Sequence, residues 1–157
     1  MSDPPTPHSP FDALSSRGSE ERLAALHALH VLEYALAAPA PRRHRTWLHR
    51  VNVAVDALHA ALQAQLPRSE GPIRLLDEIA LSYPDYIPRI QGLEQELRDL
   101  TVAVASVQEQ IEPDLTREID PTEVRNRLAT LTKRFRDHQA KEADLVHETI
   151  GRELDEN

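Results

Sequence analysis

Apolar side chains recur along this chain at alternating steps of three and four residues, the spacing of a helix that packs one face into a bundle. The clearest seam of this kind predicts a last helix over residues 124–149. Its positions are Val124, Leu128, Leu131, Phe135, His138, Glu142, Leu145 and Thr149. His138 and Glu142 stand where apolar residues are expected. Because they are one helical turn apart, both side chains should point into the same layer of the core.

Two more helices have seams with the same spacing. A helix predicted over residues 43–66 has the seam Leu48, Val51, Val55, Leu58 and Leu62, followed at the next seam position by Gln65. A helix predicted after Pro88 has the seam Ile90, Leu93, Leu97, Leu100, Val104, Val107 and Ile111. The second of these seams is entirely apolar and offers no metal ligand. Gln65, in contrast, places an amide at core register.

The first helix is predicted over residues 19–38, from an N-cap serine to a pair of prolines that end it. Its apolar arc holds Ala25, Leu26, Leu29 and Leu36. Glu33 falls inside this arc and would be a second carboxylate on a core face. His30 lies at the edge of the arc, three residues after His27, where a boundary position and a ligand role are both open.

Proline-rich segments separate the helices and set the limits of the domain. Residues 1–18 hold four prolines among polar residues, which predicts a flexible arm. A short helix is predicted over residues 73–82, and Asp-Pro-Thr-Glu at 120–123 is a strong start for the last helix. We expect the charged tail, 153–157, to fray. The sequence therefore predicts one all-α domain over residues 19–152, an antiparallel four-helix bundle with a short extra helix between the second and third helices.

Composition excludes several classes of function. The net charge of -8 argues against nucleic acid as a partner, because phosphates need a basic face. The absence of cysteine excludes disulfides, thiolate metal sites and cysteine nucleophiles. No apolar run approaches the roughly 20 residues that span a bilayer. The N-terminal residues are rich in proline and serine and have no apolar h-region, so we do not expect them to be a secretory signal. We therefore expect a cytoplasmic protein that binds neither nucleic acid nor a membrane.

The polar seam positions carry a family resemblance. The segment Asp137-His138-Gln139-Ala140-Lys141-Glu142 resembles the His-x-x-x-Glu helix of bacterial hemerythrin-like (HHE cation-binding) four-helix bundles. The segments 69–79 and 92–97 also resemble stretches of these proteins. The resemblance covers most of residues 20–155. It implies a hemerythrin-like fold, and a non-haem iron site where the ligands of the family are kept.

Carried over residue by residue, the ligand set implied by this resemblance is incomplete. His138 and Glu142 match the ligand positions of the family on the last helix. Gln65 stands where relatives place a histidine near the end of the second helix. Leu97, which follows Glu96, stands where relatives place another histidine. Two imidazoles of a complete di-iron centre are therefore absent.

The first hypothesis for the function is a non-catalytic binding or interaction module that has kept the bundle and lost the metal. Its buried hydrogen-bonded network would consist of His138, Glu142, Glu33 and Gln65. A homo-oligomer or a protein partner would then bind the surface, through an apolar patch around Trp47 or around the Tyr83 to Tyr86 turn.

The alternative is a protein that binds non-haem iron, or another divalent metal, for oxygen, nitric oxide or redox sensing. Its candidate ligands are His138, Glu142, Glu33, His30, His59 and Glu70. An acid-base enzyme built on His138 and Glu142 is disfavoured, because the sequence shows neither a nucleophile motif nor an oxyanion hole.

Overall fold

The chain is helical throughout the residues that the computed structural model describes, which are 10–38, 44–66, 75–111 and 120–157. The elements are α1 (Pro10–Ala37), α2 (His44–Gln65), α3 (Leu75–Ser82), the 3₁₀ turn η1 (Pro84–Tyr86), α4 (Ile87–Ile111) and α5 (Pro121–Glu156). These four ranges contain no strand, so the prediction of an all-α protein is confirmed. None of the helices described is long and apolar enough to cross a lipid bilayer.

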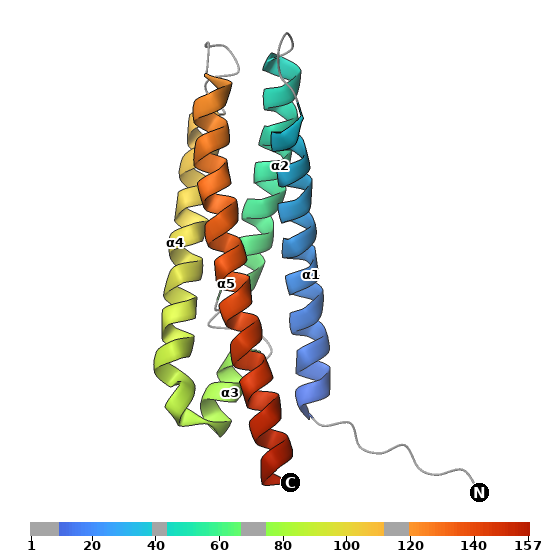
Figure 1. The fold of residues 1–157 in the computed structure, drawn as a ribbon, viewed down its shortest axis with the longest axis vertical. Helices are drawn as coiled ribbons and strands as arrows, with labels where there is room; N and C mark the ends of the chain where they lie inside the picture. The colour runs from blue at the N-terminus through green and yellow to red at the C-terminus, as the bar shows by residue number, and fades with distance from the viewer. Residues whose placement is uncertain (1–9, 39–43, 67–74, 112–119) are drawn as a thin grey trace, which may run out of the picture.

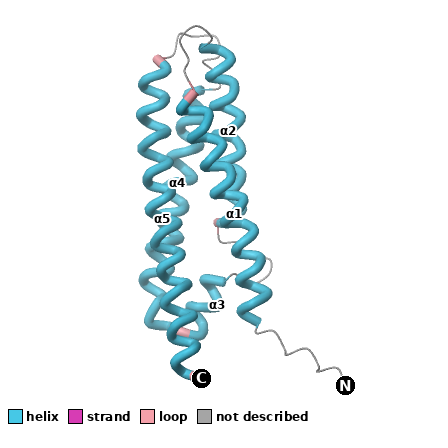
Figure 2. The backbone as a smooth tube through the Cα atoms, turned by 45° about the vertical axis from the view of Figure 1, so that its right-hand side comes forward, coloured by secondary structure: helices cyan, strands magenta, loops and turns pink. Residues whose placement is uncertain are grey.

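The long helices α1, α2, α4 and α5 lie side by side along the length of the molecule (Figure 1). α1 packs on α2, α2 on α4 and α4 on α5, and α5 also contacts α1, so the four helices enclose a common core. The short α3 lies at the end of the molecule where α4 begins (Figure 2), and it contacts both α1 and α4. With 36 residues, α5 extends for about 54 Å and passes every other element.

The core consists of two apolar clusters. The larger cluster lies among the four long helices and includes Leu29, Val55, Leu100, Leu128 and Phe135. The smaller cluster consists of Leu75, Ile79, Ile90, Leu93 and Leu145 and joins α3, α4 and α5. Every seam position predicted for α2, α4 and α5 is buried. Burial of one large aliphatic side chain contributes about 1.5–3 kcal/mol, so these seams are the main source of stability.

α1 turns a slightly different face to the core than its sequence predicts. The buried residues are Ala25, Ala28, Leu29, Leu32 and Ala35. Leu26 and Leu36, which we expected within the apolar arc, are half-buried at the edge of the buried face. Because Leu32 fills the core position, the neighbouring Glu33 is carried to the rim of the bundle.

The helix starts differ in how well the sequence predicts them. Asp120 caps α5 as expected, since its carboxylate accepts a hydrogen bond from the Thr122 N–H at 3.0 Å. α1, however, begins at Pro10 and not at Ser19, so residues 10–18 of the expected arm are helical, while residues 1–9 lie outside the described residues. Proline suits the first position of a helix, and serine and glycine lower helix propensity by no more than about 1 kcal/mol each. The polar residues between these two positions therefore do not stop the helix.

Trp47 fastens α2 to the end of α1. Its buried indole N–H donates to the carbonyl of Ala35 at 2.9 Å. Arg125 lies 5.0 Å from the centre of the indole ring and donates to the carbonyl of Ala38 at 2.6 Å. The last carbonyls of a helix have no partner within it. Side chains from α2 and α5 therefore supply the donors that the end of α1 lacks.

The C-terminal end of α5 is tied to the turn before α4. Arg152 pairs with Asp85 at 2.7 Å and lies 4.5 Å from the ring centre of Tyr83. The Tyr83 hydroxyl donates to Glu156 at 3.3 Å. The helix continues to Glu156, and the fraying that we expected of residues 153–157 stays a prediction.

Replacing Trp47 tests the joint between α1 and α2. Trp47→Phe keeps an aromatic ring but leaves the Ala35 carbonyl without its donor, and should lower the free energy of unfolding by about 1–2 kcal/mol. Trp47→Ala should cost about 3–5 kcal/mol because it also opens a cavity. Urea unfolding followed by circular dichroism measures both, with the exposed Tyr34→Phe as control. A Trp47→Phe protein as stable as the parent would contradict the role of the indole N–H.

Tyr83 should ionise later than an ordinary tyrosine. Its burial, and then the carboxylate of Glu156, raises its pKa above the usual value of about 10. Because the folded state holds the proton more tightly, this contribution to stability is complete below pH 10 and is lost as the pH rises through the raised pKa. In a pH titration followed by the ultraviolet absorbance of tyrosinate, one phenol should ionise at a higher pH than the others. This step should be absent in Tyr83→Phe and present in Tyr34→Phe. A step that persists in Tyr83→Phe would show that the phenol with the raised pKa is not Tyr83.

Candidate functional site

A group of polar side chains interrupts the apolar core between its two clusters. His138 and Glu142 project from α5 at this level, and both are buried, with His138 only 2% exposed. Phe135, in the larger cluster, stacks on the imidazole with 6.4 Å between ring centres. Leu145, one turn beyond, belongs to the smaller cluster. We name the group the polar layer, which consists of Arg22, Gln65, Glu96, His138, Lys141 and Glu142.

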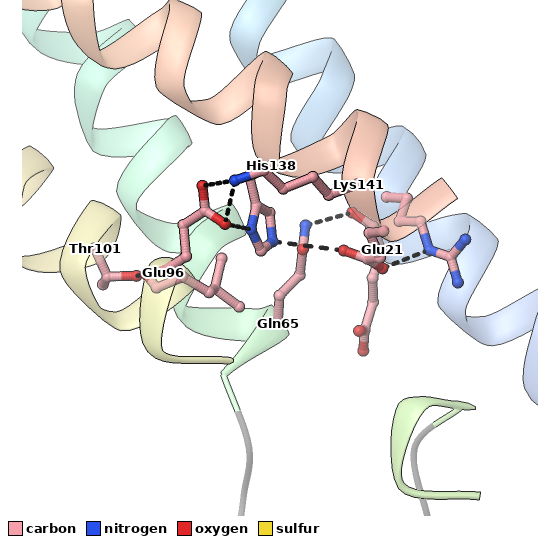
Figure 3. Close-up of polar contacts among 9 residues, drawn as sticks. Glu21, Gln65, Glu96, Thr101, His138 and Lys141 are labelled. Atoms are coloured by element: carbon pink, nitrogen blue, oxygen red, sulfur yellow. Dashed lines mark hydrogen bonds and ion pairs between the residues drawn. The ribbon is translucent and has the colours of Figure 1, made fainter. Parts of the chain in front are cut away.

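Five side chains of the polar layer form a line in which cations and carboxylates flank the imidazole. Figure 3 shows Lys141, Glu96 and His138 of this line. Lys141 Nζ lies 3.2 Å from Glu96 Oε1, and Glu96 Oε2 lies 3.5 Å from His138 Nδ1. On the other edge of the ring, His138 Nε2 lies 3.6 Å from Glu142 Oε2. Glu142 Oε1 in turn binds Arg22 Nε at 2.9 Å. Each carboxylate therefore lies between the imidazole and a cation.

All four long helices contribute to the polar layer. Arg22 comes from α1, Glu96 from α4, and the histidine, the lysine and Glu142 from α5. Gln65 comes from the last turn of α2, and its side-chain N–H donates to the main-chain carbonyl of Glu21 at 3.5 Å. Since Glu21 precedes Arg22 in the chain, the amide joins α2 to α1 beside the arginine. The layer thus connects the helices at one level of the bundle.

The charges of the layer balance each other. Two carboxylates and two cations cancel, which offsets the cost of several kcal/mol for burying an unpaired carboxylate. His138 Nδ1 is buried and forms no hydrogen bond within the described structure, with Glu96 as its carboxylate neighbour. A neutral imidazole has one N–H and a charged imidazole has two. A carboxylate at each edge of the ring therefore offers an acceptor to either nitrogen.

This geometry does not fit the metal centre that the family resemblance implies. Among the residues described, no three side chains of histidine, aspartate or glutamate form a group that could hold a metal ion. Glu96 and Glu142 lie at opposite edges of the imidazole, so an ion on one ring nitrogen would have one of these carboxylates near it. The arginine and the lysine already bind those carboxylates and would repel a divalent cation.

The other predicted ligands that the structure describes lie outside the polar layer. Both oxygens of Glu33 bind Arg136 at 2.9 Å near the surface. We expected Glu33 in the buried network, and it is not part of it. The cause is the rotation of the α1 face that places Leu32 in the core. His30 is exposed on α1, and His59 is half-buried on α2. Glu70 lies outside the described residues.

Three members of the layer were not found from the sequence, although two of them leave a signal there. Arg22 continues the α1 seam by one step of three residues before Ala25. Glu96 lies at the edge of the α4 seam, next to Leu97. Lys141 is exposed and follows no seam, so its role depends on the packing of α5 against α4.

The two surface sites that we predicted for a partner differ in their exposure. Trp47 is buried, which corrects the expectation of an apolar patch built on its side chain. Tyr83 is also buried, whereas Tyr86 is half-buried and Leu81 and Ile87 beside this turn are exposed, so a contact at the turn stays a prediction. The apolar side chains most exposed to solvent lie on several helices of the described structure. They include Tyr34 and Leu23 on α1, Leu81 on α3, Val102 on α4 and Leu154 on α5.

Comparison with known proteins does not supply a relative. A scan against protein-family models, a search of curated proteins and a search of solved structures each return no match. The chemistry of the polar layer and of the surface is therefore what points to a function.

Two substitutions of Glu142 test whether the polar layer stabilises the bundle. Glu142→Gln keeps the size and hydrogen-bonding capacity of the side chain and should cost about 1 kcal/mol of unfolding free energy. Glu142→Ala removes the partner of both His138 and Arg22 and should cost about 2–3 kcal/mol. Glu33→Ala breaks a more exposed ion pair, worth about 1 kcal/mol or less, and is the control. Equal losses for the two alanine variants in denaturant unfolding would argue against a central role for the layer.

Proposed function

We propose that this chain is a non-catalytic helical-bundle protein that acts as a binding or interaction module, with the polar layer in the place of a metal centre. The observation that carries the proposal is that both carboxylates beside His138 bind cations of the chain itself. A carboxylate that serves as a metal ligand gives its lone pairs to the ion. In this chain Arg22 and Lys141 take those lone pairs.

The proposal includes a hemerythrin-like antiparallel four-helix architecture. In the colours of Figure 1, α1 and α4 run toward one end of the molecule and α2 and α5 run back. The short α3 between α2 and α4 agrees with the extra helix expected from the sequence. These features support the resemblance, which itself depends on the residues 137–142.

In this function the polar layer acts as a cross-link that sets the register of the helices. Its charges come from α1, α4 and α5, and they pair only when these helices lie at matching heights. A shift by one helical turn moves a side chain by about 5.4 Å and breaks the pairs. Buried polar residues set register in this way in coiled coils. The layer therefore has a structural use that requires no metal.

The second candidate function is metal-dependent sensing of oxygen, nitric oxide or redox state. The buried Nδ1 of His138, which has no hydrogen-bond partner in the described structure, is the observation in its favour. Such a site would require Lys141 to release Glu96, and it would need ligands beyond these two residues. The ion pairs seen here favour the interaction module.

Metal analysis of the full chain, purified without a metal-affinity tag, separates the two functions. We expect no stoichiometric iron, manganese or zinc, and no oxo-bridge absorption after anaerobic loading with ferrous iron and exposure to air. The melting temperature should also ignore these metals, because an ion that binds only the folded state would raise it. Stoichiometric metal that is lost in Glu142→Gln and kept in Glu33→Gln would overturn the proposal.

A further inference from the structure

The four long helices form two pairs, which meet along two edges of unequal closeness. α1 packs on α2 and α4 packs on α5, as two views of the molecule show (Figure 1, Figure 2). Between the pairs, α2 packs closely on α4, whereas α1 comes close to α5 at few points in the described structure. We name the second contact the α1–α5 edge and the first the α2–α4 edge.

Three arginine side chains join α1 to α5 at three heights of the bundle. Arg125 of α5 donates to a main-chain carbonyl at the end of α1 at 2.6 Å. Arg136 of α5 binds both oxygens of Glu33 at 2.9 Å. Arg22 of α1 binds Glu142 of α5 at 2.9 Å. At 1.5 Å per residue, these contacts are about 17 Å and 9 Å apart along α5. We name them the arginine clasp.

The arginine clasp depends on charge, which salt screens. The side chains of Arg136 and Glu33 are 47% and 35% exposed, so their pair contributes little to stability and weakens as the ionic strength rises. Apolar packing needs close approach of the helices, and salt does not screen it. The α2–α4 edge has this close approach. The α1–α5 edge is therefore the weaker join between the two pairs.

Contacts within each pair are separate from the arginine clasp. The buried Trp47 of α2 donates to the carbonyl of Ala35 in α1, which holds these two helices together. Arg89 of α4 binds Glu148 of α5 at 2.6 Å. Separation along the α1–α5 edge would leave both of these contacts intact. Proteins open locally in such units, at the places where the fewest packed contacts have to break.

We propose that the bundle opens at the α1–α5 edge, with α1 and α2 moving as one unit about the α2–α4 edge, and that the arginine clasp controls this opening. Opening separates Arg22 from Glu142 and uncovers the polar layer on α5. The closed state is the one seen here, and the open state is a minor population that grows with ionic strength. This conformational device goes beyond the proposed interaction function and does not depend on it.

Two buried threonines offer matched positions for a cysteine probe, because the chain has no cysteine of its own. Thr132 lies one turn before Arg136, within about 40° of it on the side of α5 toward α1. Thr101 lies two turns before Gln108, whose side chain donates to Asp56 of α2 at 2.6 Å, so it lies on the side of α4 toward α2. Both threonines are 7% exposed, and both donate to a carbonyl of their own helix.

The rate at which dithionitrobenzoate labels each cysteine in the otherwise complete chain measures which edge opens. At low reagent concentration this rate follows the population of the open state. Thr132→Cys should be labelled at least about tenfold faster than Thr101→Cys, which reports global unfolding. Sodium chloride, raised from roughly 0.05 M to about 1 M, should speed the labelling of Thr132→Cys several-fold and leave Thr101→Cys unchanged. Equal rates, or faster labelling of Thr101→Cys, would overturn the proposal. Circular dichroism confirms that each variant is folded.

Substitution of Glu33 tests the clasp from the α1 side, so that the surroundings of the cysteine on α5 stay the same. Added to Thr132→Cys, Glu33→Gln should speed labelling up to about fivefold, the factor that an exposed ion pair supplies. Glu33→Arg together with Arg136→Glu rebuilds the pair in reverse and should restore the slow rate. Arg89→Gln breaks an ion pair of similar exposure between α4 and α5 and is the control. An equal increase from Glu33→Gln and Arg89→Gln would overturn the role of the clasp.

This inference and the proposed function can fail separately. The variants used here leave His138 and Glu142 in place, which are the residues that the metal analysis addresses. Equal labelling of the two cysteines without stoichiometric metal overturns the opening and keeps the interaction module. Salt-dependent labelling of Thr132→Cys in a chain that binds stoichiometric metal supports the opening and overturns the interaction module.

Discussion

A carboxylate on the buried seam of α5 requires opposite charge from other helices, and this requirement shapes the centre of the molecule. Glu142 is nearly covered, and the nearest imidazole is its neighbour on the same helix, so Arg22 has to reach it from α1. The same rule applies on the other side of His138, where Glu96 from α4 binds Lys141. Correct packing of the apolar seams and correct pairing of these charges therefore require the same relative position of the helices.

The polar layer also marks a change in the construction of the bundle. On the side of the layer where α5 begins, the larger apolar cluster is formed by residues of α1, α2, α4 and α5. α2 ends at the layer with Gln65, and beyond it the smaller cluster is filled from α3, α4 and α5. A short helix thus packs against α1 and α4 where α2 no longer reaches. At the level of the polar layer, α3 therefore replaces α2 as the neighbour of α4. Polar contacts tolerate this change better than an apolar seam, which needs close packing on every side.

Much of the fold can be predicted from local spacing, because a seam records which face of a helix is buried. The seams of α2, α4 and α5 are correct at every position, and so is the cap at Asp120. The α1 seam is misjudged because α1 is apolar around most of its circumference, and alanine and leucine on either side of Glu33 give two plausible faces. The polar layer is only half predictable for a related reason. A seam shows that His138 and Glu142 are buried, whereas the cations that bind the carboxylates of the layer come from edge and surface positions that depend on helix packing.

Two features of this chain do not favour stability or solubility. Charged residues lie in the core, and large apolar residues lie on the surface of α1. A partly buried group of ion pairs, such as the one that contains Glu142, is often no more stable than apolar residues of the same volume. An exposed stripe of leucine, valine and tyrosine favours aggregation over solubility. Sequences depart from the stable choice mainly where function or specificity requires it. The polar layer fits the need for a fixed register inside the bundle. The pair between Arg22 and Glu142 joins α1 to α5 at one height, so the buried seam of α1 meets the core in a single position along the bundle.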